Sequence, residues 1–429
     1  MAPSVLSAGH GKQGDAILTR SKKEQSQSCG LRAEFAALRA GCQPDGFDPY
    51  PVYRSLREFA PVWRAPWGDW YVSGFEDASK AATDASLRRS PPRERADGAG
   101  GVTGLSGRIA GFFREWLVFC DPPEHALLRR EILRLFLARD ADALVPEITS
   151  IGKTLVAELP ADHGDVVAAL TYPLPVNVIS GIVGIPDADR RKLAGWTHVM
   201  RDTLDSGVGE NDGRTAAIVE EIQSYYIELV RDRTWLNSPA GIRFAPLLKM
   251  FPAETIAANL ALLVFTGHDT TVHLIGSMLL HLSLRPDLWR RLLSEPGLVP
   301  AVVAETLRYE SPIQKLCRWT SSAFELGGEH IPGGAAIVLL FGAANRDPAQ
   351  FSQPDIFDID REPRNHLAFG RGAHLCVGRP LAIVEAETML RILLDCWQEI
   401  EVSPAGWHWY NNSSVRGLSR LNLSWRTGG

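Results

Sequence analysis

The sequence predicts a mainly α-helical protein with small β-sheets, and three patterns support this prediction. Helical periodicity recurs along the chain, one thirty-residue segment is almost wholly apolar, and short apolar runs between glycines and prolines are typical of strands. The chain has 429 residues, of which 45% are hydrophobic and 22% charged, as expected for a protein with a large core. We expect a disordered polar head over residues 1–45 and a single folded domain over residues 46–429.

The predicted elements follow the head in order. Residues 48–84 contain a short helical pattern, a hairpin signal around Gly68–Asp69 and a second helix that opens near Phe75. Later helical patterns cover residues 140–160, 188–204, 213–232 and about 297–309. The run "AAIVLL" at 335–340 predicts a strand because it is short, apolar and flanked by glycine.

The segment at 121–139 carries a distinct signal for the start of a helix. Asp121 is a candidate N-cap, and Glu124 occupies the capping-box position three residues later. Pro122 and Pro123 fall where the backbone N–H groups of a helix have no intrahelical partner, so proline costs little there. We therefore expect Asp121 to cap this helix.

The almost wholly apolar segment runs from Thr255 to Leu284, with Asp269 as its only formal charge. Its length would suffice for a membrane span. However, a central aspartate opposes insertion by roughly 2.5–3.5 kcal/mol, and the core of a large protein also contains helices that are apolar all round. We expect a buried helix at 253–284 that does not cross a membrane.

Charge and cysteine content exclude several classes of protein. The 45 basic and 50 acidic residues give a net charge of −5, so no footprint for nucleic acid is present. The six cysteines form no CxxC pair, which argues against a zinc ribbon or a disulfide scaffold and for a reducing compartment. We see no convincing targeting segment. We therefore expect a cytoplasmic protein.

The stretch "HLAFGRGAHLCVGRPLAIVE" at 366–385 places one cysteine, Cys376, in a glycine-rich loop before a helical pattern. Three interpretations compete: a thiolate that binds metal or haem, a catalytic nucleophile, and an ordinary core thiol. A nucleophile would need a base positioned beside it, and a core thiol needs no surrounding glycines.

Three further groups of residues are candidates for chemistry. Glu305 and Arg308 share a helix face, as a surface ion pair or as a buried pair with Arg361 as a third partner. His125 and Arg129 also share a face, as a solvated basic stripe or as donors to an anion. In "TGHDTT", Asp269 and Thr270 could relay protons into a dry cavity, or the threonine could bond back to a helix carbonyl at a kink.

Taken together, these motifs resemble those of the cytochrome P450 family, the haem-thiolate oxygenases, in their soluble bacterial form. "FGRGAHLC" with Gly378 is similar to the family's cysteine loop FGxGxHxC, which is highly specific. "TGHDTT", "ETLR", "DPPEH", "AANRDPAQF" and "PDIFDIDR" resemble other segments of the family in the same order, across about residues 46–425. The resemblance implies the family's triangular helical prism with a smaller strand-rich lobe.

The resemblance also implies roles for particular residues. Cys376 would bind the iron of haem b as a thiolate, with Phe369 and Gly378 beside the sulfur. The haem propionates would be held by His125, Arg129, Arg318 and His374. Asp269 and Thr270 would supply protons, and Glu305, Arg308 and Arg361 would support the fold. Candidate substrate-pocket residues are Phe112, Phe113, Trp116, Leu262, Phe265, Thr266, Ile313 and the turn near Asn411–Asn412, although core packing explains any one of them equally well.

The implied reaction inserts one atom of O2 into a small apolar organic substrate, with electrons from NAD(P)H delivered by a ferredoxin or flavodoxin and its reductase. A positive face from Arg129, Arg130, Arg371 and Arg379 would meet that acidic partner. Two alternatives remain, a haem sensor or carrier without turnover and a peroxide-driven enzyme. The sequence departs from the family's pattern at Leu127, Thr266, Lys315 and Ile383. The resemblance places Thr266 where the family usually has Gly or Ala, and Lys315 where it often has an apolar residue facing the substrate, so we expect these two residues to affect the handling of oxygen and the shape of the substrate pocket.

Overall fold

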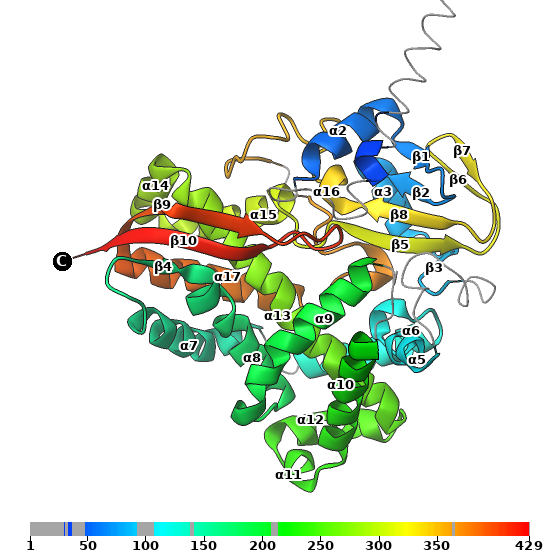
Figure 1. Ribbon diagram of the computed structural model, residues 1–429, viewed down its shortest axis with the longest axis horizontal. Coiled ribbons are helices and arrows are strands. Elements are labelled where there is room, and N and C mark those ends of the chain that lie inside the picture. Colours follow the sequence, from blue (N-terminus) through cyan, green and yellow to red (C-terminus); the bar gives the residue numbers. More distant parts are fainter. Residues whose placement is uncertain are drawn as a thin grey trace, which may run out of the picture.

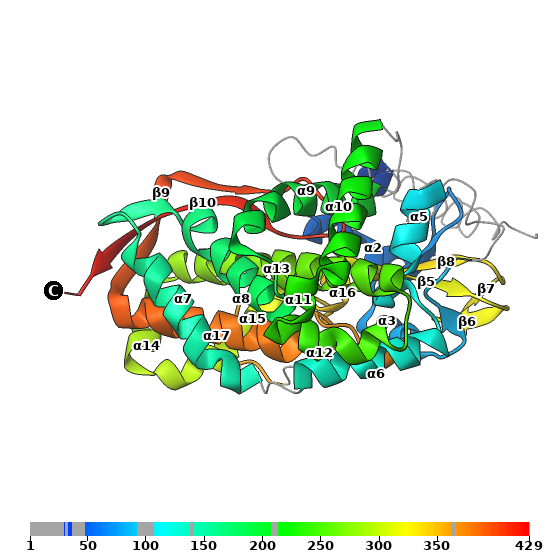
Figure 2. The same cartoon turned by 90° about the horizontal axis from the view of Figure 1, so that it is seen from below.

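Helices dominate the computed structural model of the protein, which describes residues 30, 33–36, 48–91, 107–137, 141–206, 213–362 and 365–428. They surround α13 (Ala253–Ser283), which runs through the middle of the helical part in both views (Figures 1 and 2). The other helices are α2 (Tyr50–Phe59), α3 (Phe75–Thr83), α5 (Gly107–Arg114), α6 (Glu124–Leu137), α7 (Val145–Ala157), α8 (Pro173–Val183), α9 (Arg190–Ser206), α10 (Gly213–Arg231), α11 (Arg233–Leu236), α12 (Pro239–Leu248), α14 (Pro286–Ser294), α15 (Val299–Tyr309), α16 (Phe341–Ala344) and α17 (Arg379–Cys396).

The long helix α13 is buried over most of its length, as expected for the apolar segment. It follows Pro252 and packs against α8, α10, α15 and α17. Within the described part of the chain, no helix combines the length and the apolar character needed to cross a membrane. These four helices are spread over residues 173–396, so α13 connects segments that are far apart in the sequence, and the site is built on it.

The largest sheet forms a smaller part at one edge of the molecule, away from β4, β9 and β10 (Figure 1). This sheet has the order β1-β2-β8-β5-β3, in which β2 and β8 are parallel and the other neighbours antiparallel. Its strands are β1 (Val62–Arg64), β2 (Trp70–Val72), β3 (Leu87–Arg88), β5 (Lys315–Thr320) and β8 (Ala336–Leu340). This sheet contains the predicted hairpin and the predicted strand at 335–340.

Two further sheets lie outside it. The order β4-β10-β9 joins β4 (His163–Asp165), β10 (Leu418–Thr427) and β9 (Trp397–Trp409), while β6 (Phe324–Leu326) pairs with β7 (Glu329–Ile331). The connection between β9 and β10 reaches back across the molecule toward the start of β5 (Figure 1), where the Gln314 amide donates to the carbonyl of Ser414 at 2.8 Å.

The predicted N-cap of α6 is wrong. The Asp121 carboxylate accepts hydrogen bonds from the backbone N–H groups of Arg89 and Ser90, at 2.7 and 3.0 Å, and from the Ser90 hydroxyl. Proline has no N–H to offer a cap, and Pro122 and Pro123 follow directly. Asp121 therefore ties the segment after β3 to the start of α6.

Part of the predicted head packs against the fold. Residues 33–36 are helical, and the Phe35 side chain is buried beside Trp63 and Tyr71, with ring centroids 5.5 and 4.6 Å away. The structure therefore differs from the prediction at these residues. The remaining residues of the head, apart from Gly30, lie outside the described residues.

Candidate active site

The cysteine loop joins the strand-rich part to α17. Gly370 and Gly372 adopt positive φ values of 69° and 73°, which glycine reaches without the steric cost of a Cβ. A Cβ on Gly372 would also lie 3.1 Å from the backbone of Thr83 on α3. The Cys376 N–H donates to the carbonyl of Phe369 at 2.9 Å and closes the loop. The glycines thus hold the thiol at the start of α17.

The surroundings of Cys376 act on its thiol in two directions. Burial raises the pKa, while the backbone N–H groups of Gly378 and Arg379 and the guanidinium of Arg129 favour the thiolate. The residue nevertheless has exposed surface, which is possible where protein surrounds a side chain on most sides but not on one. Such a sulfur can act as a ligand once a cation stabilises the thiolate.

Three arginines and two histidines gather beside the loop. Burial and, to a smaller extent, the positive charge of Arg89 lower the pKa of Arg318 to about 9. Burial, with His125 and nearby arginines, lowers the pKa of His374 to about 2. The rings of His125 and His374 are tilted by 35° with their centroids 4.0 Å apart, and Arg129 donates to the carbonyl of Leu375 at 2.5 Å. The sequence predicted all of these residues except Arg89.

This group fits the two propionates of a haem. The side-chain hydrogen bonds of Arg89, Arg129 and Arg318 go to carbonyl oxygens, and none of them forms an ion pair with a carboxylate among the described residues. Nε2 of His125 is buried and likewise lacks a hydrogen-bond partner there. Buried cations are costly unless an anion is near. Together with a thiol in a glycine loop, these donors match the charge and chemistry of haem.

Glu305 lies at the centre of a buried ion cluster. Its two oxygens each accept a hydrogen bond from Arg308 at 2.7 Å. Arg361 lies 3.3 Å away, and the Asp358 amide donates at 2.8 Å. Arg308 also donates to the carbonyl of Asn345, whose side chain accepts from the amide of Leu367 just before the cysteine loop. The cluster is therefore connected to that loop.

Asp269 lies buried on α13, and its partners come from two helices. Oδ1 accepts from Arg201 of α9 at 2.9 Å, and Nε2 of His273 lies 3.6 Å away, just beyond hydrogen-bond length. Burial alone would raise the pKa of Asp269, but His273, Arg201 and His268 outweigh it and lower the pKa to about 2. Oδ2 has no hydrogen-bond partner among the described residues. The sequence indicated neither Arg201 nor His273.

The least covered face of α13 lies next to Asp269. Thr266, Gly267 and Thr270 keep partial exposure on an otherwise buried stretch and share one side of the helix. Thr270 Oγ1 donates to the carbonyl of Thr266 at 2.9 Å, and Thr266 Oγ1 donates to that of Leu262 at 2.7 Å. A Cβ on Gly267 would collide with Ile179 of α8 at 2.9 Å. Back-bonding of threonine, one of the two interpretations of this motif, is therefore present, and it leaves the Thr270 oxygen free to accept a hydrogen bond from another donor.

The candidate pocket residues occupy two kinds of position. Five of them belong to one buried hydrophobic cluster with edge-to-face and tilted aromatic contacts: Phe112, Phe113, Trp116, Leu262 and Phe265. The other two, Thr266 and Ile313, keep partial exposure, and Ile313 bridges to Val415 beyond the predicted turn. Packing in the core explains the first five as well as contact with a substrate does.

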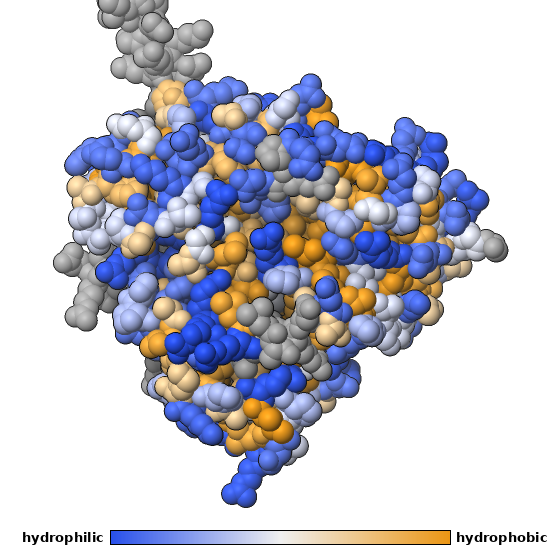
Figure 3. All heavy atoms as spheres, turned by 180° about the vertical axis from the view of Figure 1, so that it is seen from behind, coloured by the Kyte–Doolittle hydropathy of each residue, from blue (hydrophilic) through white to orange (hydrophobic). Residues whose placement is uncertain are grey.

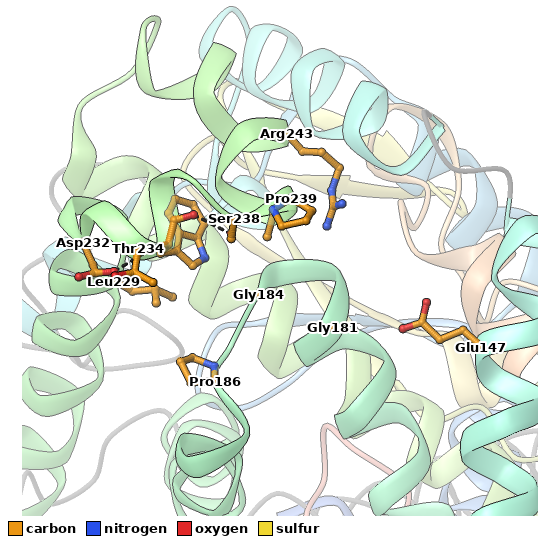
Figure 4. A pocket seen from close by; sticks show the side chains of 12 residues that line it. Glu147, Gly181, Gly184, Pro186, Leu229, Asp232, Thr234, Ser238, Pro239 and Arg243 are labelled. Atoms are coloured by element: carbon orange, nitrogen blue, oxygen red, sulfur yellow. Dashed lines mark hydrogen bonds between the residues drawn. The ribbon is translucent and has the colours of Figure 1, made fainter.

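An open pocket of about 410 Å³ lies elsewhere, bordered by α7, α8, α10, α11 and α12. Figure 4 shows Glu147 and Arg243 on different sides of it. Its lining contains none of the predicted site residues. We propose that the chemistry takes place at Cys376 and Asp269 instead, because the thiol, the arginines and a carboxylate with one unpartnered oxygen are there.

The expected positive face on the cysteine side needs a correction at Arg129, which turns inward to the carbonyl of Leu375. Arg130 and Arg134 are exposed, at 53% and 66%, but both pair with Glu131. Figure 2 places α6 and α17 on the side away from α9, and Figure 3 shows that side with hydrophilic and apolar residues interspersed. Leu127 adds an exposed apolar side chain to α6.

Comparison with known proteins agrees with this site. A family model described as Cytochrome P450 matches residues 245–403. The cytochrome P450 monooxygenase PikC of Streptomyces venezuelae is 32% identical over 417 residues, which cover 93% of this chain and 97% of that one. Cyclomarin C epoxidase CymV of Salinispora arenicola is 33% identical over 396 residues, with 87% and 95% coverage. The crystal structure of P450BioI with an acyl carrier protein ligated to hexadec-9Z-enoic acid matches with a TM-score of 0.80 at 29% identity, covering 88% of this chain and 98% of that one.

The chain belongs to the cytochrome P450 family. It is a cytochrome P450 monooxygenase, with the helical fold and small sheets predicted from the sequence. Membership of the family implies a haem group, a redox partner and a small-molecule substrate.

Proposed function

We propose that this enzyme oxidises a small, largely apolar secondary metabolite, with its haem held by the Cys376 thiolate. The observation that carries the proposal is the group of arginines and histidines beside the cysteine loop, which lacks a carboxylate partner among the described residues. Two propionates would supply the missing negative charge. Haem bound in this way supplies the activation of O2 and the oxidation of the substrate.

The residues of the chain contribute binding and proton transfer. Arg129, Arg318, His125 and His374 would hold the propionates, with Arg89 behind them. Thr270 would accept a hydrogen bond from water at its hydroxyl oxygen, because its proton is donated to the Thr266 carbonyl. Asp269 would pass protons toward that hydroxyl from the side on which Arg201 and His273 lie. The apolar residues around Phe265 would exclude bulk water, so protons would have to come through such side chains.

We further propose that a ferredoxin or flavodoxin, with its reductase, delivers electrons from NAD(P)H to the face formed by α6 and the start of α17. Exposed Arg379 supports an acidic partner there, together with the one positive charge by which Arg130 and Arg134 exceed their shared partner Glu131. A cytoplasmic location, where NAD(P)H is available, is part of this proposal. The named activity of cyclomarin C epoxidase supports epoxidation as one form that this oxidation can take.

The spectrum of the reduced protein with CO tests the thiolate. We expect purified protein to contain b-type haem, and the main absorption band to move to the position characteristic of thiolate ligation. Cys376→Ser should abolish that band, because a hydroxyl is a poor substitute for a thiolate. Cys396→Ser, at the far end of α17, is the matched control and should keep it. Persistence of the band in Cys376→Ser, or purification of a zinc protein, would contradict the proposal.

A further inference from the structure

Lys315, one of the departures from the family's pattern, has a defined place in the structure. Its ammonium donates to Ser413 Oγ at 2.5 Å and lies 3.5 Å from Oδ1 of Asp205. The two charged side chains are 23% and 13% exposed, so they are partly shielded from solvent. Lys315 starts β5, and Ser413 belongs to the connection between β9 and β10. Lys315 thus joins the strand-rich part to α9.

Asp205 is the centre of this polar junction. Its carboxylate accepts hydrogen bonds from the amide of Ser413 at 2.9 Å, from the Ser413 hydroxyl at 2.7 Å and from the Ser414 hydroxyl at 2.6 Å. Burial would raise the pKa of Asp205, but Lys315 and the two serines lower it, so the group is ionised at neutral pH. Because so many of the contacts are internal, the junction is suited to fastening segments together rather than to recognising a ligand.

The same face of α9 carries two more attachments. Thr197, Arg201 and Asp205 are spaced four residues apart, which places them in one row. Thr197 Oγ1 lies 2.8 Å from Nε2 of His268, and Arg201 holds Asp269 at 2.9 Å. Nδ1 of His268 faces the carbonyl of Val264, which only accepts, so Nδ1 carries the proton and Nε2 accepts from the threonine. The first two attachments hold α9 to α13, and the third holds it to β5 and the connection between β9 and β10.

The position of α9 determines how firmly Asp269 is held. Arg201 lies one helical turn from Asp205, and its guanidinium stacks on Tyr410 at 3.8 Å. The groups that face Asp269 are Arg201 on α9, His268 and His273 on α13, and Tyr172 just before α8. A carboxylate that is paired with a guanidinium is rarely protonated. A proton relay through Asp269 therefore depends on the distance between Asp269 and Arg201.

We propose that Asp205, clamped by Lys315, Ser413 and Ser414, is a positioning residue that holds α9 against α13 and thereby sets the contact between Arg201 and Asp269. This inference rests on the proposed relay through Asp269. The wall formed by the start of β5 and the connection between β9 and β10 is then mechanically coupled to the proton-handling residue, about one helical turn away.

The test compares Asp205→Asn with Asp187→Asn in the haem-loaded enzyme. Asp187 also forms an ion pair with α9, through Arg190 at 2.6 Å, but its side chain is 87% exposed. Asp205→Asn should make the amides in the last two turns of α9 exchange with deuterium about tenfold faster, measured by mass spectrometry without substrate or electrons. It should also lower kcat by about tenfold with little change in KM. Asp187→Asn should change neither.

A double-mutant cycle separates positioning from general loss of structure. In an Arg201→Met background, Asp205→Asn should cause no further loss of kcat, because the residue acts through Arg201. Additive losses would overturn the proposal, as would wild-type exchange in α9. If Asp205→Asn does not accumulate, Ser414→Ala removes one hydrogen bond and is expected to show the same non-additivity. A wild-type kcat in Asp269→Asn would refute the relay itself, whereas a slow Asp269→Asn beside a normal Asp205→Asn would refute only the positioning role.

Discussion

Two buried carboxylates on neighbouring helices differ in how fully their surroundings satisfy them. Glu305 on α15 receives hydrogen bonds on both oxygens, from Arg308, Arg361 and the amide of Asp358. Asp269 on α13 is held at Oδ1 alone, by Arg201, while Oδ2 has no partner among the described residues. Both are almost inaccessible, with exposures of 4% each. The two carboxylates are therefore equally buried, and they differ in whether both of their oxygens accept hydrogen bonds.

The difference indicates what each carboxylate is for. A buried charge is costly unless its hydrogen-bonding capacity is filled, so a group that serves the fold should be fully partnered. A group that moves protons must keep one position for the exchanging partner. We therefore propose that the Glu305 cluster supports the cysteine loop through Asn345 and Leu367, and that Asp269 takes part in the chemistry. Substitutions at the two sites should then affect different properties.

The largest effect is expected for Glu305→Ala. Removing one partner of a buried ion cluster costs about 3–5 kcal/mol, a large share of the roughly 5–15 kcal/mol of stability of a native protein. The variant should yield little haem-loaded soluble protein, measured by haem absorbance per mole of chain and by Tm. Glu295→Ala is the control, because Glu295 is 56% exposed in its pair with Arg291. Normal haem content and Tm in Glu305→Ala would remove the contrast between the two sites.

Asp269→Asn should slow turnover by roughly 10²–10⁴-fold while leaving haem and substrate binding intact, since the amide cannot pass a proton as a carboxylate does. Loss of stability should be smaller than in Glu305→Ala, because only one oxygen is held. The measurements are kcat with saturating substrate and the substrate Kd from the ferric spectrum. Glu254→Gln changes an exposed carboxylate at the start of the same helix and should leave both unchanged. An equally fast Asp269→Asn would assign Asp269 to structure alone.

The sequence predicted one of these two sites more completely than the other. Glu305 and Arg308 lie three residues apart on one helix, so their contact follows from helical geometry. The sequence predicted the cysteine loop equally well, because its glycines, thiol and histidine are contiguous. Arg201 lies 68 residues from Asp269, and Arg89 joins the arginine group from the end of a short strand. No periodicity reports such contacts, because they depend on how α9 and β3 pack.

Some elements of the fold were likewise predicted from the sequence, and others were not. The apolar segment predicted α13 to within a residue or two, and the hairpin signal predicted β1 and β2. The long strands β9 and β10 were missed, because Pro404 and Gly406 interrupt β9 and the pairing of the two strands contains register shifts. Asp121 was assigned to the wrong backbone donors, because a cap is a local rule and the amides of Arg89 and Ser90 come from a distant segment. Local signals were sufficient only where the partners were local.

Thr270→Ala should separate electron use from product formation. Without the hydroxyl, protons and water near Asp269 are no longer held in place, so NAD(P)H consumption continues while hydrogen peroxide replaces product. We expect the ratio of product to NAD(P)H to fall by about tenfold, equivalent to about 1.4 kcal/mol. Thr270→Ser should restore the ratio, and Thr271→Ala is the control, because Thr271 is buried on the next position of α13. A fully coupled Thr270→Ala enzyme would remove the hydroxyl from the relay.

A third buried carboxyl group has even fewer hydrogen-bond partners than Asp269. Glu385 on α17 is fully buried, and neither of its oxygens has a hydrogen-bond partner among the described residues. Burial raises its pKa well above the ordinary value, so the group is protonated in the folded protein. Glu305 is satisfied by partners, Asp269 is satisfied at one oxygen, and Glu385 avoids the cost of burial by remaining neutral.

The smallest effect on turnover is therefore expected for Glu385→Gln, which replaces a neutral acid with a neutral amide of the same shape. Between the unfolded pKa and the raised folded pKa, the folded state binds one proton more than the unfolded state. The stability of the wild type should then fall as pH rises, by at most about 1.4 kcal/mol per pH unit. The glutamine variant lacks this slope, so the two proteins should be similar in Tm near pH 5 and the variant the more stable near pH 8. Glu387→Gln, a partly exposed neighbour near Arg391, is the control and should follow the wild type. A wild-type slope in Glu385→Gln would mean that Glu385 is ionised and that a partner satisfies it, as at Glu305.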